Sequence, residues 1–379
     1  MKIAMIGHKV VPSREGGIEI VVEELATRMT AAGHEVTLYN RKRKRAKGER
    51  KRTEFAGCRV EEVFTVDKRS LDAIVYAFFA TLKARRLARK GKLDVLHYHA
   101  EGPCFFLGLL PKKKRKFKLV VTIHGLDWQR GKWGGFATKI LKKGERNAVK
   151  YADEIIVLSE NNRKYFKETY NRETVFIPNG VREPECLPAE IIRDKWGLER
   201  DSYVLFLARI VPEKGLHYLV NAWKRLVERG VTDKKLVIAG GASHSAEYYE
   251  GIAKSCEGDP SVLMTGFVEG KTLKELYSGA YLYVLPSDLE GMPMSFLEAL
   301  SYGNICLVSD IEENAEVAAA ANENGRCAYT FKHGDEADLE AKIEALLKAE
   351  LKTHVAPVLP FRWEDVTERT IEVYKRKDC

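Results

Sequence analysis

The sequence predicts an α/β protein made of two doubly wound domains that face one another across a cleft. Its 379 residues are too many for one ordinary core and suit two domains of about 150–200 residues each. Short apolar runs alternate with amphipathic helical stretches along the chain. Several runs are apolar on both faces, as the central strands of a parallel sheet require. The pattern of strand, helix and strand therefore occurs twice, once in each domain.

The apolar runs predict the strands in chain order. In the first half they fall at residues 2–7, 35–40, 60–66, 95–99, 119–124, 154–158 and 175–178. In the second half they fall at residues 204–208, 236–240, 263–266, 282–285, 305–309 and 327–329. Apolar residues at helical spacing predict helices over 18–32, 71–89, 215–229, 271–279, 294–302 and 336–349.

A Pro-containing stretch over residues 178–198 separates the two halves, because prolines and polar turn residues interrupt regular elements. We therefore expect an N-terminal domain over 1–182 and a C-terminal domain over 183–360. A last helical pattern over 362–377 follows Pro357 and Pro360. Segment 361–379 is expected to pack back onto the first domain.

The net charge of +9 is distributed unevenly along the chain. Residues 1–180 hold 39 Lys and Arg against 20 Asp and Glu, a balance of +19; the remaining 24 and 34 give −10. Two basic runs dominate the first half, at 41–52 and 112–118. Each could be a solvated loop, but two runs on one domain favour contact with an anionic surface.

No apolar stretch reaches the ~20 residues that a membrane-spanning helix needs, and no secretion signal is recognisable. The seven cysteines are scattered, without a C-x-x-C pair, which argues against a disulfide framework or a zinc site. We therefore expect a cytoplasmic protein.

Glu290 and Glu298 have the strongest functional signal. They follow the strand expected at 282–285, and Gly291 and Pro293 between them suit a close ligand approach and a helix start. The two carboxylates could bind the two sets of hydroxyls of a nucleotide sugar, with the helix N-terminus facing its pyrophosphate. Spacing alone would favour two solvated acids; the strand–Gly–Pro–helix context favours a site.

Arg209 and Lys214 flank the loop that follows the strand at 204–208. Fixed cations there could bind a leaving pyrophosphate, although basic pairs at strand ends are usually solvated. No Asp-x-Asp occurs in the chain, a motif that commonly holds a divalent ion on a pyrophosphate. Its absence fits a site in which Arg209, Lys214 and a helix dipole carry that charge.

The first half offers weaker candidates. Gly16 and Gly17 form the turn before the first helix and permit close approach of a ligand, although a plain turn is equally consistent. His124 opens a polar loop after the strand at 119–124 and is the best candidate for contacting substrate hydroxyls. His97 and His99 share one strand without further metal-ligand spacing, so metal binding is disfavoured. For His97, a structural role and a site role are equally consistent.

Together these motifs resemble the glycosyltransferase family 4 enzymes of the GT-B fold, over the whole chain. The resemblance rests on the GG turn and on PNGV, ARIVPEKG, TGFV and EGMPMSFLEALSYG at 16–17, 178–181, 208–215, 265–268 and 290–303. DVLHYHAEGP and THGLDWQRGKWG further resemble bacterial members that build exopolysaccharide, capsule or other cell-surface glycans. The sequence departs from common members at Asn304 and in the run at 316–321, which leaves donor identity open.

The resemblance implies roles for the matching residues of the second domain. Glu298 would bind the donor ribose, and Glu290 would contact the transferred sugar near its anomeric centre. Gly291, Met292 and Pro293 would pass along that sugar.

Four further implied roles complete the site. Arg209 and Lys214 would hold the diphosphate, and backbone around Gly266 and Phe267 would meet the base. Gly17 would approach phosphate or acceptor, and His124 would touch the sugar from the first domain. The candidate catalytic residues are Glu290, His124, Arg209 and Lys214.

The resemblance implies a retaining, metal-independent transferase that requires no cofactor beyond its nucleoside-diphosphate-sugar donor. It would move a hexose-type sugar to a saccharide acceptor in the first domain, a lipid-linked precursor of a cell-surface polysaccharide. The basic first domain would then meet an anionic membrane, at the inner face of the cell membrane.

Two other classes remain as alternatives. A sugar-nucleotide epimerase or a phosphorylase could share the fold, since fold does not determine chemistry, but epimerases of this fold lack the EGMPMSFLEA pattern. A nucleic-acid-binding protein would explain the basic runs, which however lack interleaved aromatic residues apart from Phe117. We expect no nucleic-acid partner.

Overall fold

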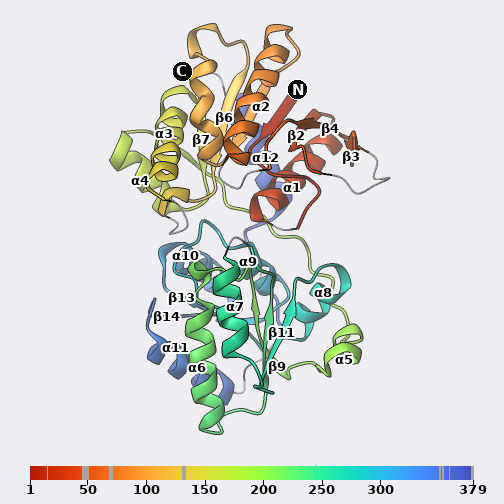
Figure 1. The fold of residues 1–379 in the computed structure, drawn as a ribbon, viewed down its shortest axis with the longest axis vertical. Helices are drawn as coiled ribbons and strands as arrows, with labels where there is room; N and C mark the ends of the chain where they lie inside the picture. The colour runs from red at the N-terminus through yellow and green to blue at the C-terminus, as the bar shows by residue number, and fades with distance from the viewer. Residues whose placement is uncertain are drawn as a thin grey trace. The chain divides into compact units, whose positions relative to one another are not determined.

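The computed structural model describes residues 1–14, 16–44, 51–67, 71–129, 134–243, 245–349, 351, 354–357 and 359–376. The chain forms two compact units (Figure 1). Unit 1 comprises residues 1–180 together with 361–379, and unit 2 comprises residues 181–360. The chain passes from unit 1 to unit 2 at Gly180, inside the Pro-containing stretch.

Unit 1 is built on an eight-stranded sheet with the strand order β3-β4-β2-β1-β5-β6-β7-β8. Neighbouring strands run parallel, except for the antiparallel pair β3 and β4 at one edge. The strands are β1 (Lys2–Ile6), β2 (Glu35–Arg41), β3 (Glu54–Phe55), β4 (Cys58–Val63), β5 (Val95–His99), β6 (Lys118–Ile123), β7 (Glu154–Val157) and β8 (Val175–Phe176).

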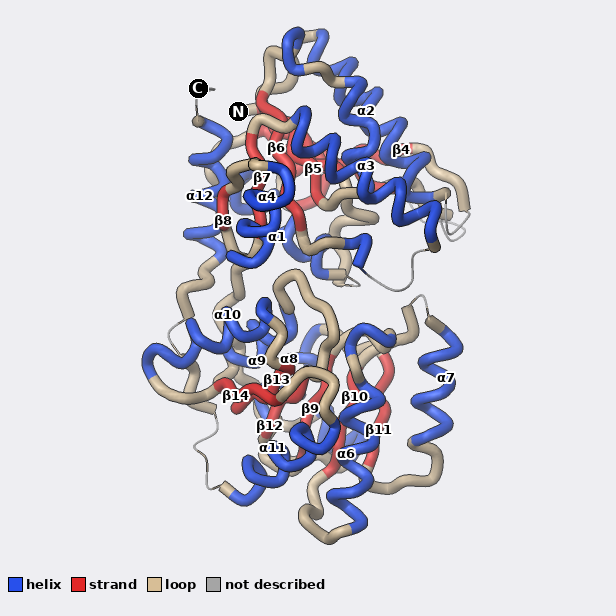
Figure 2. Tube along the Cα trace, turned by 90° about the vertical axis from the view of Figure 1, so that its left-hand side faces the viewer, coloured by secondary structure: helices blue, strands red, loops and turns tan. Residues whose placement is uncertain are grey.

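Helices cover both faces of this sheet, as apolar strands without a polar face require. On one side lie α2 (Asp72–Arg89), the 3₁₀ helix η1 (Gly102–Leu109) and α3 (Gly135–Tyr151); on the other lies α12 (Trp363–Lys375), which contacts α1 (Gly17–Ala31) (Figure 2). Helix α4 (Glu160–Tyr170) contacts β7 and β8. The core beneath α2 and η1 includes Leu96 and Tyr98, so the alternate residues of β5, among them His97, face the other layer.

Helix α12 belongs to unit 1 although it follows unit 2 in the sequence. Its Tyr374 hydroxyl is hydrogen-bonded to His97 Nδ1 at 2.7 Å, and Arg369 donates to the Phe176 carbonyl oxygen at 2.5 Å. The Trp363 side chain is fully buried, and a Cβ on Gly180 would lie 2.5 Å from its ring. The segment after residue 360 therefore completes the core of unit 1.

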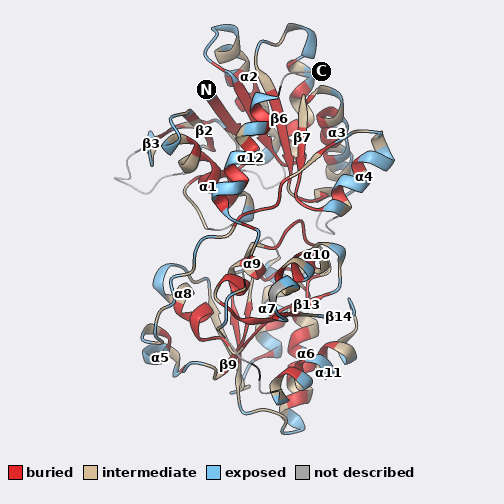
Figure 3. Ribbon diagram, turned by 180° about the vertical axis from the view of Figure 1, so that it is seen from behind, coloured by how far each residue is buried: buried red, intermediate tan, exposed pale blue. Residues whose placement is uncertain are grey.

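Unit 2 holds a six-stranded, all-parallel sheet with the order β11-β10-β9-β12-β13-β14. The strands are β9 (Tyr203–Leu207), β10 (Lys235–Ala239), β11 (Val262–Gly266), β12 (Leu282–Leu285), β13 (Ile305–Ser309) and β14 (Ala328–Phe331). The helices are α5 (Ile191–Trp196), α6 (Leu216–Glu228), α7 (Ala246–Ser255), α8 (Gly270–Gly279), α9 (Met294–Ser301), α10 (Glu312–Ala321) and α11 (Glu336–Lys348). The strands of both units are largely buried (Figure 3).

The predicted fold class, α/β with two parallel-sheet domains, is confirmed. The pattern predicts β4 through residue 66, but the strand ends at Val63 and Phe64 is exposed. Helices α3, α4, α5, α7 and α10 have no counterpart in the prediction. Among the buried positions of α3 only Leu141 is a large apolar residue, since the others are Gly144, Glu145, Asn147 and Ala148. No helix among the described residues is both long and apolar enough to cross a bilayer.

Candidate functional site

The carboxyl ends of β9 and β12 position the main candidates of unit 2. These strands are parallel neighbours, so the loops that follow them emerge at one edge of the sheet. The first loop carries Arg209, which is half-buried, and ends in the 3₁₀ turn Pro212–Lys214. The second carries Glu290 to Pro293 and leads into α9. The Asp288 backbone N–H donates to the Glu213 carbonyl oxygen at 3.0 Å, which joins the two loops.

Lys214 and Glu290 form an ion pair across these loops. Only 13% of the lysine side chain and 7% of the glutamate side chain is exposed. Little water can screen this pair, so its electrostatic interaction is stronger than that of a surface pair. Because an ammonium group has three donors, Lys214 can hold Glu290 and still donate to a bound anion.

A hydrogen-bonded chain supports the Glu290 carboxylate from behind. The buried Ser287 hydroxyl donates to Glu290 Oε1 at 2.7 Å. The Ser309 hydroxyl donates to the Ser287 carbonyl oxygen, and Asn314 Nδ2 donates to Ser309 Oγ at 3.0 Å. These three residues come from the β12 loop, β13 and α10, and sequence reasoning missed them, because nothing in their spacing relates them to Glu290.

Glu298 lies on α9, one turn beyond the Gly-Met-Pro turn. Its Oε2 accepts a hydrogen bond from the Tyr277 hydroxyl at 3.0 Å. The Tyr277 ring is buried and stacks on Tyr302, with ring centroids 5.3 Å apart. The N-cap residue Pro293 makes no side-chain cap to the N-terminus of α9, which begins at Met294. Its first backbone N–H groups can therefore bind an anion.

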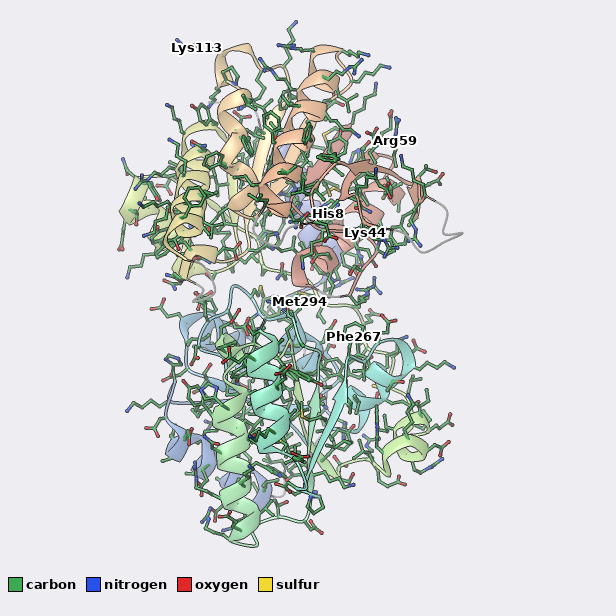
Figure 4. All side chains as sticks on the ribbon, in the orientation of Figure 1. His8, Lys44, Arg59, Lys113, Phe267 and Met294 are labelled. Atoms are coloured by element: carbon green, nitrogen blue, oxygen red, sulfur yellow. The ribbon has the colours of Figure 1, made fainter. Side chains whose placement is uncertain are left out.

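Gly266 and Phe267 lie at the end of β11, separated from β9 by β10. Gly266 has a φ of +72°, which favours glycine, and the Phe267 side chain is 53% exposed. Figure 4 shows Phe267 and Met294 at the same end of the unit 2 sheet. The candidate residues of this unit thus share one edge, but Gly266 and Phe267 are not part of the joined loops.

Asn304, at which the sequence departs from the resemblance, has a structural role. It is fully buried, and its Nδ2 donates to the carbonyl oxygens of Tyr277 and Ala280 at 2.8 and 3.3 Å. The amide thereby holds the C-terminal end of α8, which carries Tyr277, beside α9. The run at 316–321 lies inside α10.

Histidines gather at the carboxyl edge of the unit 1 sheet, where β1, β5 and β6 are neighbours. A hydrogen bond of 3.0 Å joins His99 Nδ1 to His124 Nε2, and the two rings are stacked. Burial holds the pKa of His99 well below its usual value and lowers the pKa of His8 to about 4. His8 Nδ1 and His99 Nε2 are buried without a protein partner in the described part of the chain. His124 is half-buried and packs against the uncharged ring of His99.

His97 is a structural histidine. It is fully buried, and both ring nitrogens have partners at 2.7 Å, the hydroxyls of Tyr374 and Thr122. Burial lowers its pKa from 6.5 to about 3. Of the two readings that the sequence leaves open for His97, the structural one therefore fits.

This burial predicts a pH-dependent contribution of His97 to stability. The unfolded state takes up a proton below pH 6.5 and the folded state does so only near pH 3, so this stability is present above pH 6.5 and is lost as pH falls. At about pH 5 the loss is about 2 kcal/mol. Urea unfolding of the wild type and of His97→Gln at neutral pH and at about pH 5 tests it.

Between neutral pH and about pH 5, the free energy of unfolding should fall by about 2 kcal/mol more in the wild type than in His97→Gln. Comparison with the variant is needed because Glu101, whose pKa burial raises well above its usual value, contributes with the opposite sign. Equal losses in both proteins would contradict the assignment of a neutral, structural His97.

Gly17 is the first residue of α1, after Gly16 at the N-cap. The buried Glu19 carboxylate lies against this turn: its Oε1 accepts from the Lys9 backbone N–H at 2.8 Å. A Cβ on Gly16 would lie 2.2 Å from Glu19 Oε2, so the carboxylate in its present position lies directly against the glycine. A carboxylate at this helix end disfavours a phosphate and favours an uncharged ligand with hydroxyl donors.

The loop that carries His124 is anchored by a buried acidic pair. Glu101 Oε2 accepts from the Asp127 backbone N–H at 3.1 Å, and Glu145 Oε2 accepts from the Trp128 indole at 2.8 Å. Glu101 is fully buried on the loop after β5. The sequence around Glu101 gives no signal for this anchoring role, because Asp127 is 26 positions away.

Parts of the two basic runs are structural. Arg41 pairs with Asp72 at 2.5 Å and lies over the Tyr76 ring, and Arg115 is buried in an ion pair with Asp153. Residues 45–50 of the first run lie outside the described residues. Figure 4 shows Lys44 and Arg59 on the side of unit 1 that carries β3 and β4. Within the described chain, no group of three His, Cys, Asp or Glu side chains could hold a metal ion.

Two family models match the chain, one in each half. The model Glycosyltransferase Family 4 matches residues 15–183, and the model Glycosyl transferases group 1 matches residues 188–356. An uncharacterised glycosyltransferase of Methanocaldococcus jannaschii is 26% identical over 82% of this chain and 81% of its own. A UDP-Gal:α-D-GlcNAc-diphosphoundecaprenol α-1,3-galactosyltransferase of Escherichia coli is 28% identical over 60% of this chain and 61% of its own.

Solved structures share the fold at lower identity. Sucrose-phosphate synthase of Thermosynechococcus elongatus superposes with a TM-score of 0.76 at 19% identity, covering 99% of this chain and 98% of its own. HepE of Anabaena, in complex with UDP and glucose, gives a TM-score of 0.75 at 17% identity and covers 100% of both chains. The fold is thus the GT-B fold. With one model on each half, the chain belongs to the glycosyltransferases of family 4 and group 1 type.

Proposed function

We propose that this glycosyltransferase moves a hexose-type sugar from a nucleoside-diphosphate sugar to a saccharide acceptor with retention of anomeric configuration. The observation that supports it best is the buried Lys214–Glu290 pair beside the uncapped N-terminus of α9. The lysine, Arg209 and the helix N-terminus supply the positive potential that a diphosphate requires. Gly291, Met292 and Pro293 allow the sugar to lie close to the backbone.

In this proposal the donor extends along the loop edge of unit 2. Glu298, oriented by Tyr277, accepts hydrogen bonds from the ribose hydroxyls. The backbone at Gly266 and the exposed Phe267 meet the base. Arg209 and Lys214 bind the diphosphate and stabilise its negative charge, so that transfer proceeds without a metal ion. Retention follows if the acceptor attacks from the face that the diphosphate leaves, with the leaving phosphate taking the proton.

Unit 1 would bind the acceptor. Glu19 at the start of α1 favours hydroxyl donors over phosphate, which supports an acceptor role for Gly17 rather than a donor role. His124, kept in place by His99 and by the anchored loop, would contact the transferred sugar. A relative that acts on a diphosphoundecaprenol-linked sugar supports a lipid-linked acceptor, bound at an anionic membrane surface.

A calorimetric screen of UDP-, GDP-, dTDP- and ADP-sugars, with and without a chelator, tests the donor class. Binding of one donor that survives the chelator is the expected result. Donor incubated alone should stay intact, because an isomerised nucleotide sugar would favour an epimerase. The anomeric configuration of the product, determined by NMR, tests retention. Failure to bind any of the four would contradict the proposal.

Replacing Glu298 with alanine should lower kcat/KM by roughly 100-fold, because hydrogen bonds to a carboxylate contribute about 1.5–3 kcal/mol. The fold should stay intact, since Glu298 is only partly buried. Steady-state kinetics and thermal unfolding measure both effects. Tyr277→Phe is the matched control: it removes the hydroxyl that orients Glu298 while retaining the ring stack, and should cost less. Wild-type kinetics in Glu298→Ala would contradict the proposal that Glu298 binds the donor ribose.

A further inference from the structure

A strip of aromatic rings crosses the surface of unit 1 from the end of β4 over α2 to η1. Phe64 and Phe79 are in edge contact, with centroids 5.3 Å apart, and Phe78 and Phe106 continue the strip at the same spacing. Phe64 is 52% exposed, Phe79 38% and Leu82 36%. Three neighbouring large apolar side chains on one surface exceed the scattered exposure that ordinary surfaces show.

Lysines surround the start of this strip. A hollow in the surface is lined by Lys42, Lys51, Glu62, Phe64 and Lys83. Three ammonium groups face one carboxylate there, so the hollow is positively charged. Lys83 Nζ also lies 3.4 Å from Glu61 Oε2. Arg59 pairs with Oε1 of the same carboxylate. The two acids therefore do not neutralise the cations around them.

Helix α2 also carries exposed apolar side chains and an excess of positive charge. After Asp72, which pairs with Arg41, it carries four basic residues and no acidic one. Phe79, Leu82 and Lys83 lie on one exposed side of the helix, because positions three and four apart share a side. An exposed helix side with aromatic, aliphatic and basic side chains is typical of helices that lie in a membrane interface.

We propose that Phe64, Phe79 and Leu82, with Lys42, Lys51 and Lys83 around them, form a docking surface for an anionic lipid bilayer, here termed the α2 surface. The hollow binds lipid phosphate, and the exposed rings enter the interface beside it. A nucleic acid would use the cations but gives no reason for an exposed leucine, and a neutral protein partner gives no reason for the lysines. This inference rests on the proposed membrane-borne acceptor and names the surface that reaches it.

Cosedimentation of the full chain with vesicles tests the α2 surface. Vesicles of phosphatidylcholine mixed with phosphatidylglycerol should bind the wild type, and vesicles of phosphatidylcholine alone should bind it weakly. Lys42→Glu with Lys83→Glu should lower binding by at least about 30-fold, since each basic residue contributes about 1 kcal/mol. Phe64→Ser with Phe79→Ser, which leaves the charge unchanged, should lower it by about 10-fold.

The matched control is Lys164→Glu with Lys167→Glu. It makes the same change in net charge on α4, which contacts β7 and β8 at the far end of the sheet from β4. Binding of this control should stay within about threefold of wild type, because surface charges act over a Debye length of about 10 Å. Thermal unfolding of each variant verifies the fold.

Three results would overturn the α2 surface: equal losses in the two lysine variants, wild-type binding in the phenylalanine variant, or tighter binding to duplex DNA than to anionic vesicles. The nucleotide-sugar screen is independent of all three. Vesicle binding without any donor binding would defeat the proposed function alone. Donor binding and transfer with normal vesicle binding in both α2 variants would defeat the α2 surface alone.

Discussion

Lys214→Ala is expected to lower kcat/KM by roughly 1,000-fold, at the upper end of what one stabilising donor contributes. The variant removes the cation that we assign to the diphosphate and leaves the Glu290 carboxylate buried without its partner. Breaking a buried pair from one side costs about 3–5 kcal/mol, so the free energy of unfolding should fall as well. Steady-state kinetics and urea unfolding measure the two effects.

A double variant separates the two causes. Lys214→Met combined with Glu290→Leu replaces the pair by apolar side chains of similar length, which is often neutral for stability. It should regain most of the lost unfolding free energy while activity stays as low as in the single variant. Recovery of activity in the double variant would mean that the pair only supports the loops.

Conservative variants sharpen the same experiment. Lys214→Arg retains a cation on the loop and should lose much less activity than Lys214→Ala. Glu290→Gln retains an oxygen that can accept from the Ser287 hydroxyl, yet removes the negative charge. If Glu290 acts on the reacting sugar through its charge, Glu290→Gln should lose activity as well as the stability that the buried ion pair with Lys214 provides. Equal activity in Glu290→Gln and wild type would contradict that role.

The sequence determines the fold class through features that are local. Apolar runs such as those of β5 and β12 are buried on both sides, and their alternation with helices predicts two parallel sheets. The turn and helix that carry Glu290 and Glu298 are predictable for the same reason, since strand, Gly, Pro and helix follow one another within a few residues. These features depend on neighbours in the chain, which the sequence shows directly.

Contacts between distant residues could not be predicted in this way. Lys214 and Glu290 are 76 positions apart, and Tyr277 reaches Glu298 from another helix. The support of Glu290 by Ser309 and Asn314 depends on how β13 and α10 pack beside β12. Serine and asparagine occur throughout the chain, so their types carry no signal until the fold brings them together.

The second large effect is expected at Gly215, where the two loops of the candidate site meet. Gly215 has a φ of +63°, and a Cβ there would lie 1.9 Å from the Pro286 carbonyl oxygen. Backbone of the β12 loop cannot yield easily, because Asp288 is hydrogen-bonded to Glu213 on the same two loops. Gly215→Ala must therefore push the loops apart.

Gly197→Ala is a close control, because Gly197 has the same φ of +63° but no atom of the described residues within 4 Å of the added Cβ. Its free energy of unfolding should fall by only about 1 kcal/mol, because alanine adopts a positive φ less readily than glycine, and its activity should stay normal. The free energy of unfolding of Gly215→Ala should fall by about 3–5 kcal/mol. Its activity should fall as well, because Lys214 is displaced. Urea unfolding and kinetics of both variants measure the difference. Similar losses in the two would show that the loops are not held together at this contact, and the assignment of Lys214 and Glu290 to one site would then lack its structural basis.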